Sequence, residues 1–328
     1  MELGYALSSE EHAPLDLVRH ARRAEEAGFP YALVSDHFHP WIDRQGQSSF
    51  VWGVLGAIAT QTESLRVGTG VTCPTIRIHP AIVAQAAATA ASLMPGRFFL
   101  GVGTGENLNE HILADRWPSA SERLDMLEEA VELIRELWKG ELTSFDGTCY
   151  VVEDARIYTL PEEPIEIVVA AGAREAAELA GRIGDGLVST SPDSKFVDGF
   201  LAAGGKGPRY GQLTVCWAKS EAAARRTAFE VWPNAGLVGP LSQELPLPSH
   251  FEAAAAMVDE DAVAEVVVCG PDPERHLEGI RMFVDTGFDH VYVHQVGPDQ
   301  DGFMDFYERE IIAEASSLEP GRKEVVRA

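Results

Sequence analysis

Two short polar segments carry side chains that could transfer protons. Segment 35–41 (SDHFHPW) directly follows an apolar run and contains His37 and Trp41, and segment 101–107 (GVGTGEN) follows another and contains Glu106. A histidine beside a carboxylate can exchange protons near neutral pH. A lone histidine at a strand end is more often a structural hydrogen-bonding group. Three candidates at matching strand ends favour a catalytic site instead.

The spacing of His37 and His39 also allows a metal site. Alternate residues of a strand point to one face, and barrel metallohydrolases use such a pair as ligands. The fifth and sixth apolar runs supply no further histidine, and both His290 and His294 lie in the eighth. Pro40 also ends the strand at once. We therefore expect no catalytic metal.

The glycines of segment 101–105 give it a superficial likeness to a dinucleotide-binding loop. The third glycine of that fingerprint would fall at Glu106, whose carboxylate would repel a pyrophosphate. We expect instead a floor of small residues that a flat ring can approach closely.

Two other strand ends could contact a ligand. Segment 170–173 (AAGA) precedes a predicted helix, and small residues at a helix N-terminus let a phosphate reach backbone N–H groups. Thr190 and Ser191 could add hydroxyl groups. Segment 68–75 (GTGVTCPT) is either irregular backbone against a ligand or a simple turn, and the residues leave both open.

The elements that position these segments alternate between short apolar runs and amphipathic stretches. Apolar, β-branched runs separated by helices indicate a parallel sheet buried on both faces. Eight such runs without a break in composition favour a (β/α)8 TIM barrel over two Rossmann-like halves. All strand ends of a barrel meet at one mouth, which would bring His37, Trp41 and Glu106 together. The predicted strands are 3–7, 31–35, 65–71, 98–103, 165–171, 186–189, 212–217 and 290–295, and helical patterns include 15–27, 50–62, 81–93, 119–139, 174–182, 220–231 and 273–285.

Two insertions interrupt the alternation in what we expect to be a single barrel domain, residues 1–328. Segment 141–164, after the fourth strand, is typical of a β-type excursion. Segment 233–265, after the seventh strand, begins with an apolar, proline-rich stretch. Insertions after barrel strands tend to lie over the mouth, so this one is either a pocket lid or a packed surface connection.

The composition excludes several classes of function. The 328 residues are 45% apolar and 23% charged, which is ordinary for a globular protein. The 51 acidic and 26 basic residues give a net charge of −25, which disfavours nucleic-acid and acidic-membrane partners. The four cysteines form no CxxC pair, and the chain has no membrane span and no signal peptide pattern. We expect a cytoplasmic protein with a small-molecule substrate.

Several longer motifs point to one family. They are SDHFHPW (35–41), GTGVTCPT (68–75), FLGVGTGENLNEH (99–111), LWKGE (137–141), FDGTCY (145–150), VAAGAREAAELAGRIGDG (169–186) and FDHVYVHQVGPDQ (288–300). Taken together, they make the chain resemble the luciferase-like superfamily of barrels. Within it, the chain is most similar to the group of coenzyme F420-dependent oxidoreductases that includes the F420-dependent glucose-6-phosphate dehydrogenases. The pairing of SDHFxPW with GTGE is specific, whereas either alone is only suggestive.

The resemblance implies a deazaflavin, F420, bound in the barrel mouth, with hydride passing between its C5 and a substrate carbon. It implies that His37 is the base for a hydroxyl proton, that Trp41 stabilises the intermediate and that Glu106 protonates the deazaflavin N1. A buried Glu106 with a raised pKa would suit that role. Glu10 matches a carboxylate of the substrate pocket. The implied cofactor contacts are Asp36, Gly70, Val71, Thr104, Asn109, Ala170, Ala171, Gly172 and Thr190.

Two structural expectations also follow from the resemblance alone. A non-proline cis peptide is typical of the bulge after the third strand, which places it at Gly70–Val71. Related barrels commonly dimerise, so we expect a homodimer.

The chain departs from the sugar-phosphate enzymes where they hold the phosphate with basic side chains. The corresponding positions here are Asp193, a neutral residue near Ser242, and Val266, with Lys195 as a partial replacement. An acid and two uncharged residues cannot clamp a phosphate, so we do not expect glucose 6-phosphate as substrate. We expect hydride transfer involving a neutral or weakly charged alcohol, aldehyde or ketone. The alternatives are an FMN-dependent luciferase-like monooxygenase and an F420-binding carrier without a substrate.

Overall fold

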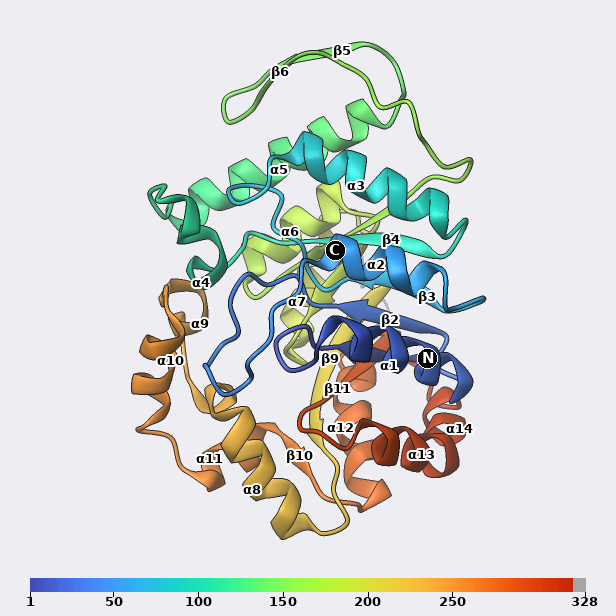
Figure 1. Cartoon of the computed structure of the whole chain (residues 1–328), viewed down its shortest axis with the longest axis vertical. Helices are drawn as coiled ribbons and strands as arrows, with labels where there is room; N and C mark the ends of the chain where they lie inside the picture. Colours follow the sequence, from blue (N-terminus) through green and yellow to red (C-terminus); the bar gives the residue numbers. More distant parts are fainter. Residues whose placement is uncertain (321–328) are drawn as a thin grey trace.

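Eight parallel strands close into a barrel in a computed structural model that describes residues 1–320 (Figure 1). The strands pair in chain order, and pairing of β8 with β9 and of β11 with β1 completes the circle. This confirms the predicted (β/α)8 TIM barrel. The barrel strands are β1 (Glu2–Leu7), β2 (Tyr31–Val34), β3 (Arg66–Thr69), β4 (Phe98–Val102), β7 (Glu166–Ala170), β8 (Gly186–Ser189), β9 (Arg209–Cys216) and β11 (His290–Gln295).

Helices surround the strands and follow the amphipathic patterns of the sequence (Figure 1). The seven predicted helical stretches correspond to α1, α2, α3, α5, α6, α8 and α12, whereas α7 and α13 lie outside the predicted ranges. The helices are α1 (Pro14–Glu26), α2 (Val51–Ala59), α3 (Pro80–Leu93), α4 (Asn107–Glu110), α5 (Ala120–Leu137), α6 (Arg174–Ile183), α7 (Ser194–Ala202), α8 (Glu221–Val231), α9 (Leu241–Glu244), α10 (Pro248–Ala255), α11 (Glu260–Val266), α12 (Pro273–Asp285), α13 (Gln300–Glu310) and α14 (Ile312–Ser316), with 3-10 turns η1 (His111–Leu113) and η2 (Pro233–Gly236). No helix within residues 1–320 has the length and apolarity needed to cross a bilayer.

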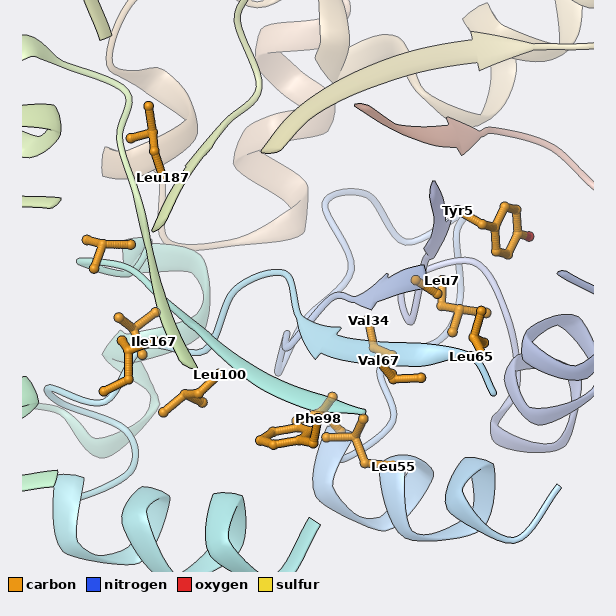
Figure 2. Close-up of a cluster of buried hydrophobic side chains, with 14 of the residues drawn as sticks. Tyr5, Leu7, Val34, Leu55, Leu65, Val67, Phe98, Leu100, Ile167 and Leu187 are labelled. Carbon is orange, nitrogen blue, oxygen red and sulfur yellow. The ribbon is translucent and has the colours of Figure 1, made fainter. Parts of the chain in front are cut away.

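Alternate side chains of each strand form two apolar layers. One layer consists only of strand residues and fills the barrel interior; its buried members are Ala6, Tyr31, Leu33, Phe99, Val168, Val188, Tyr210 and Tyr292. The other layer packs the outer face of the strands against the helices, and Figure 2 shows part of it around Leu7, Val34 and Leu55. Because aromatic rings fill the interior, a ligand must bind above it, at the carboxyl ends of the strands.

The first insertion is a β-hairpin, as its sequence predicted. Strands β5 (Thr143–Asp146) and β6 (Val151–Ala155) pair antiparallel, and Figure 1 shows them projecting beyond α5. The Glu129 carboxylate of α5 accepts backbone N–H bonds from Cys149 and Tyr150, both at 2.7 Å. The hairpin lies outside the barrel, and its Tyr150 hydroxyl donates to the carbonyl of Thr75, in the segment after β3, at 2.9 Å.

The second insertion is largely helical and packs beside the mouth. It contains η2, α9, α10 and α11, followed by the two-residue strand β10 (Val268–Cys269) that pairs with β9. Asn107 Nδ2 donates to the carbonyl of Glu244 in α9 at 3.0 Å, and Trp117 Nε1 donates to its carboxylate at 3.1 Å. The proline-rich stretch is compatible with these four short helical segments because Pro233 and Pro248 stand at helix starts, where proline is favourable.

Candidate active site

Glu10, His37 and Glu106 meet at the barrel mouth from the loops that follow β1, β2 and β4. His37 Nε2 lies 3.2 Å from Oε1 of Glu10 and 3.4 Å from Oε2 of Glu106. His37 Nδ1 lies 3.2 Å from the carbonyl oxygen of His39, which can only accept a hydrogen bond. Nδ1 therefore carries a hydrogen, and Nε2 is the nitrogen that can exchange a proton.

Glu10 is the ionised partner of His37. Its Oε2 accepts hydrogen bonds from the hydroxyls of Ser35, at 2.5 Å, and Ser8, at 3.1 Å. Burial opposes ionisation of Glu10, but the charge of His37 and the Ser35 hydrogen bond outweigh it and lower the pKa of Glu10. Burial also disfavours the His37 cation, yet Glu10 and Glu106 raise the pKa of His37 overall. Both pKa shifts favour an imidazolium beside a carboxylate.

Glu106 has the opposite character. Burial raises the pKa of Glu106 to about 7, and repulsion from Glu10 and Glu110 adds to this, although His37 and Asn109 pull it down. Its side chain remains 30% exposed, against 4% for Glu10. Glu10 and Glu106 both lie beside Nε2 of His37, but their pKa values move in opposite directions. One glutamate can therefore act as a base and the other as an acid.

Trp41 links the His37 loop to the second insertion. Its ring centroid lies 5.1 Å from that of His37 and 5.2 Å from that of Phe251 in α10. The backbone N–H of Trp41 donates to Oε1 of Gln45 at 2.8 Å. Residues before position 50 and an insertion beyond position 233 therefore build one wall of the site together.

Asn109 fixes both catalytic loops. This buried side chain accepts N–H bonds at Oδ1 from Phe38, at 2.9 Å, and His39, at 3.2 Å. Its Nδ2 donates to Oε2 of Glu106 at 3.1 Å. The amide of Asn109 thus positions both loops within the chain, and its cofactor contact stays a prediction.

Asp36 is the centre of a buried charge cluster that sequence reasoning missed. Its Oδ1 lies 3.0 Å from Nη2 of Arg77, and its Oδ2 accepts from the Thr72 hydroxyl at 2.8 Å. Arg77 also donates its backbone N–H to Glu110 at 2.7 Å, and its Nε lies 3.5 Å from the same carboxylate. Arg77 is a lone base in an apolar stretch, and Glu110 stands four residues after Glu106 in a helical turn; these were the available signals.

The peptide bond between Gly70 and Val71 is cis, as the resemblance predicted. The neighbouring glycines have a role different from the expected one. A Cβ at Gly101 would overlap the Thr69 carbonyl oxygen, and a Cβ at Gly103 would lie 2.8 Å from Val71. These two glycines let β4 approach the end of β3, and their role as a floor for a flat ring stays a prediction.

The ends of β7 and β8 leave the start of α6 open. Helix α6 begins without a side-chain cap, and a Cβ at Gly172 would meet open space. Gly172 and Thr190 are exposed there, while Thr104 and Ala170 are half-buried. Uncapped N–H groups at a helix start suit a phosphate group, so these residues fit the predicted cofactor contacts.

The positions where the sugar-phosphate enzymes hold the phosphate form no phosphate-binding cluster in this chain. Asp193 caps α7 by accepting the Lys195 N–H at 3.0 Å, and the Lys195 ammonium lies 2.7 Å from the same carboxylate. Ser242 lies in α9, and Val266 is exposed at the end of α11. The charge of Lys195 is thus neutralised within the chain.

His39 turns away from His37. Its Nδ1 lies 2.8 Å from the carbonyl of Leu108, and its ring stacks on that of His111 at 5.6 Å. Within residues 1–320, no three His, Cys, Asp or Glu side chains are arranged to hold a metal ion.

A surface hollow of about 440 Å³ beside Arg66, Phe98 and Glu166 lies at the opposite, amino-terminal end of the strands.

The chain is similar to known proteins along most of its length. The family model for luciferase-like monooxygenases matches residues 1–290. The chain is 36% identical to an F420-dependent glucose-6-phosphate dehydrogenase of Intrasporangium calvum over 328 residues, covering 95% of this chain and 98% of the relative. A solved F420-dependent secondary alcohol dehydrogenase, in complex with an F420–acetone adduct, superposes with a TM-score of 0.88 at 30% identity, over 96% of this chain and 98% of that one. A monooxygenase from Streptomyces bottropensis, at 20% identity and a TM-score of 0.73 over 96% and 99% of the two chains, shares the fold.

Proposed function

Because this chain belongs to the luciferase-like monooxygenase family, we propose that it is an F420-dependent oxidoreductase acting on an alcohol or carbonyl compound. The observation that carries this proposal is the placement of His37 Nε2 between Glu10 and Glu106, whose pKa values move in opposite directions. Bound F420 would supply the C5 position that accepts or gives the hydride.

The protein side chains would manage the protons. In carbonyl reduction, the His37 imidazolium gives its Nε2 proton to the carbonyl oxygen; in alcohol oxidation, neutral His37 takes the hydroxyl proton. Glu10 stays ionised and stabilises the imidazolium. Glu106 holds a proton near neutral pH and would give it to the deazaflavin N1, and Trp41, whose ring lies 5.1 Å from that of His37, would stabilise the intermediate. Proton transfer of this kind accounts for about 10²–10⁴ in rate.

The predicted cofactor contacts fall into two groups under this proposal. Gly70, Val71, Thr104, Ala170 and Ala171 border the mouth, and the open start of α6 with Gly172 and Thr190 would receive a phosphate group. Asp36 and Asn109 would act through Arg77, Thr72 and Glu106 rather than by contact. Pairing of Lys195 with Asp193 supports a substrate without a phosphate group.

A fluorescence titration with F420 and separately with FMN tests the cofactor assignment. We expect submicromolar binding of F420 and negligible binding of FMN. Preference for FMN would contradict the proposal and favour the monooxygenase alternative. The likeness to monooxygenases at 20% identity supports the fold alone.

We further propose that the protein is a cytoplasmic homodimer with a small-molecule substrate. Size-exclusion chromatography with light scattering would test the dimer: a mass near 71 kDa, twice the 35.6 kDa of the chain, supports it, and the monomer mass contradicts it.

A further inference from the structure

One buried arginine joins the loop that carries His37 to the short helix that follows Glu106. Arg77 lies between β3 and α3, and its side chain is 7% exposed. Its Nη2 donates to Oδ1 of Asp36 at 3.0 Å and to the backbone carbonyl of Asp36 at 3.3 Å. Its backbone N–H donates to Oε2 of Glu110 at 2.7 Å, and its Nε donates to Oε1 of Glu110 at 3.5 Å. Arg77 therefore contacts two of the three segments that build the site.

Both partners of Arg77 stand close in the chain to a proton-transfer residue. Asp36 directly precedes His37. Glu110 stands one helical turn after Glu106, and its backbone N–H donates to the carbonyl of Glu106 at 3.1 Å. A shift of either partner would move the residue beside it. Because Nε2 of His37 and Oε2 of Glu106 are 3.4 Å apart, a small shift would change how the two face each other.

The second carboxylate oxygen of Asp36 is also held within the chain. The Thr72 hydroxyl donates to Oδ2 of Asp36 at 2.8 Å. The backbone of Thr72 is bonded to the end of β4, since its N–H donates to Gly101 at 2.9 Å and its carbonyl accepts from Gly103 at 3.0 Å. The barrel thus holds Asp36 at one oxygen, and Arg77 holds it at the other.

The guanidinium is suited to this task by its shape as well as by its charge. It is planar and donates in fixed directions, whereas a lysine ammonium is a point charge on a flexible stem. Asp36 and Glu110 are buried, at 0% and 1% side-chain exposure, and buried carboxylates without a cation are costly. A lysine at position 77 would supply the cation without the fixed directions. This substitution therefore separates charge from geometry.

We propose that Arg77 is a positioning residue of the reaction. It holds His37 in place through Asp36. Its bonds to Glu110 hold Glu106 in the same way. This inference rests on the proposed function. Because Arg77 acts from behind the site, its replacement should slow the chemical step more than it weakens binding.

Substitution by lysine tests the geometry and keeps the charge. For the F420-loaded enzyme, with 2-propanol as the probe substrate, we expect Arg77→Lys to lower kcat about tenfold or more. KM and the Kd for F420 should change by less than about threefold. Arg77→Lys should also unfold closer to the wild type in urea than Arg77→Met does, because the buried carboxylates keep a cation.

Arg209→Lys is the matched control for this substitution. Arg209 is also ion-paired, with Asp289, but it lies at the amino-terminal end of the barrel, where β9 begins. Its replacement should leave kcat within about twofold of the wild type. An Arg77→Lys enzyme with the kcat of the wild type would overturn the inference, and so would equal losses of kcat in the two variants.

A double-mutant cycle tests whether Arg77 acts through Asp36. Asp36→Asn weakens the same contact from the other side and should also lower kcat. We expect the enzyme with both Arg77→Lys and Asp36→Asn to be at most about threefold slower than the slower single variant, because both changes disrupt one contact. Losses of kcat that multiply would show that the two residues act independently and would contradict the inference.

A measurement without cofactor or substrate separates this inference from the proposed function. NMR of the histidine rings in the unloaded protein follows His37 near Arg77 and His290 near Arg209, since Asp289 bonds both Arg209 and Nδ1 of His290. We expect Arg77→Lys to shift the signals of His37 and not those of His290, and Arg209→Lys to do the reverse. Unshifted His37 signals in Arg77→Lys would reject the positioning role even in a protein that binds F420. Shifted signals in a protein that does not bind F420 would reject the proposed function and leave the placement of His37 by Arg77 standing.

Discussion

Glu10 and Glu106 approach the same nitrogen of His37, at 3.2 and 3.4 Å, yet one has a lowered pKa and the other a raised one. Glu10 receives hydroxyl hydrogen bonds from Ser8 and Ser35, which stabilise its anion. Glu106 has one amide donor, Asn109, and faces the charges of Glu10 and Glu110. The charge of His37 and these hydrogen bonds thus outweigh burial at Glu10, whereas burial and repulsion from Glu10 and Glu110 prevail at Glu106.

Removing either proton-transfer group should abolish turnover without abolishing cofactor binding. We expect His37→Ala and Glu106→Gln to lower kcat by about 10²–10⁴ while the Kd for F420 stays near the wild-type value. Stopped-flow absorbance at the F420 band and fluorescence titration measure the two quantities. Near-wild-type rates in both variants would show that the assigned roles are wrong.

The rate of F420 reduction should fall as the pH rises through about 7. This reaction needs protonated Glu106, whose pKa is about 7, and the fraction that carries the proton declines above that value. In a pH profile of kcat/KM, the descending limb should disappear in Glu106→Gln. A limb that persists in this variant would assign the titration to another group.

Asn109 should tune Glu106 as well as hold the His37 loop. Asn109→Ala removes a hydrogen bond that lowers the pKa of Glu106, so the descending limb should move to higher pH. It also leaves the partly buried N–H groups of Phe38 and His39 without their acceptor, which costs about 1 kcal/mol in the free energy of unfolding. Asn109→Asp keeps the acceptor but places a carboxylate beside Glu106, so it should move the descending limb further to higher pH than Asn109→Ala does. An unmoved limb in Asn109→Ala would contradict the tuning role.

Arg77 should be needed for folding stability more than an ordinary surface arginine. Arg77→Met leaves Asp36 and Glu110 as buried carboxylates without their cation, at a cost of about 3–5 kcal/mol. Arg44, whose partner Glu230 is exposed, is the matched control, and Arg44→Met should cost at most about 1 kcal/mol. Urea unfolding measures both, and equal losses would mean that the buried cluster contributes no more than a surface pair.

A negative charge at the start of α6 should weaken the binding of F420, whereas a small neutral side chain should not. Gly172→Ala fits the open space around this residue and should bind F420 normally. Gly172→Asp places a negative charge where we propose a phosphate group, so its Kd for F420 should rise about tenfold or more. Unchanged affinity in Gly172→Asp would place the phosphate elsewhere.

The sequence was most informative where local pattern alone decides the structure. Each of the eight barrel strands is a short apolar run that helices cover, so their number and order could be predicted. Strand limits were less certain: β9 begins at Arg209, three residues before its predicted start, because Asp289 binds the Arg209 backbone at 2.8 Å. That contact joins residues 80 positions apart and leaves no local signal.

Site residues at strand ends could be found, but their partners could not. His37 and Glu106 were predicted as neighbours because both follow barrel strands, and they are neighbours. Asn109 and Asp36 were predicted as cofactor contacts, but the sequence did not show their partners within the chain. These are Phe38, His39 and Glu106 for Asn109, and Arg77 and Thr72 for Asp36. Residue type and position show where a side chain stands, whereas its partners depend on packing across the barrel.

The closure of the barrel has a consequence for the growing chain on the ribosome. Glu10, His37 and Glu106 all lie in the first third of the sequence, but β1 gains its second neighbour only when Tyr5 pairs with Val293. Until β11 emerges, one edge of β1 lacks the partner it has in the finished barrel. Nascent chains that stall before position 290 therefore hold the catalytic side chains on an open sheet, and such edges favour aggregation.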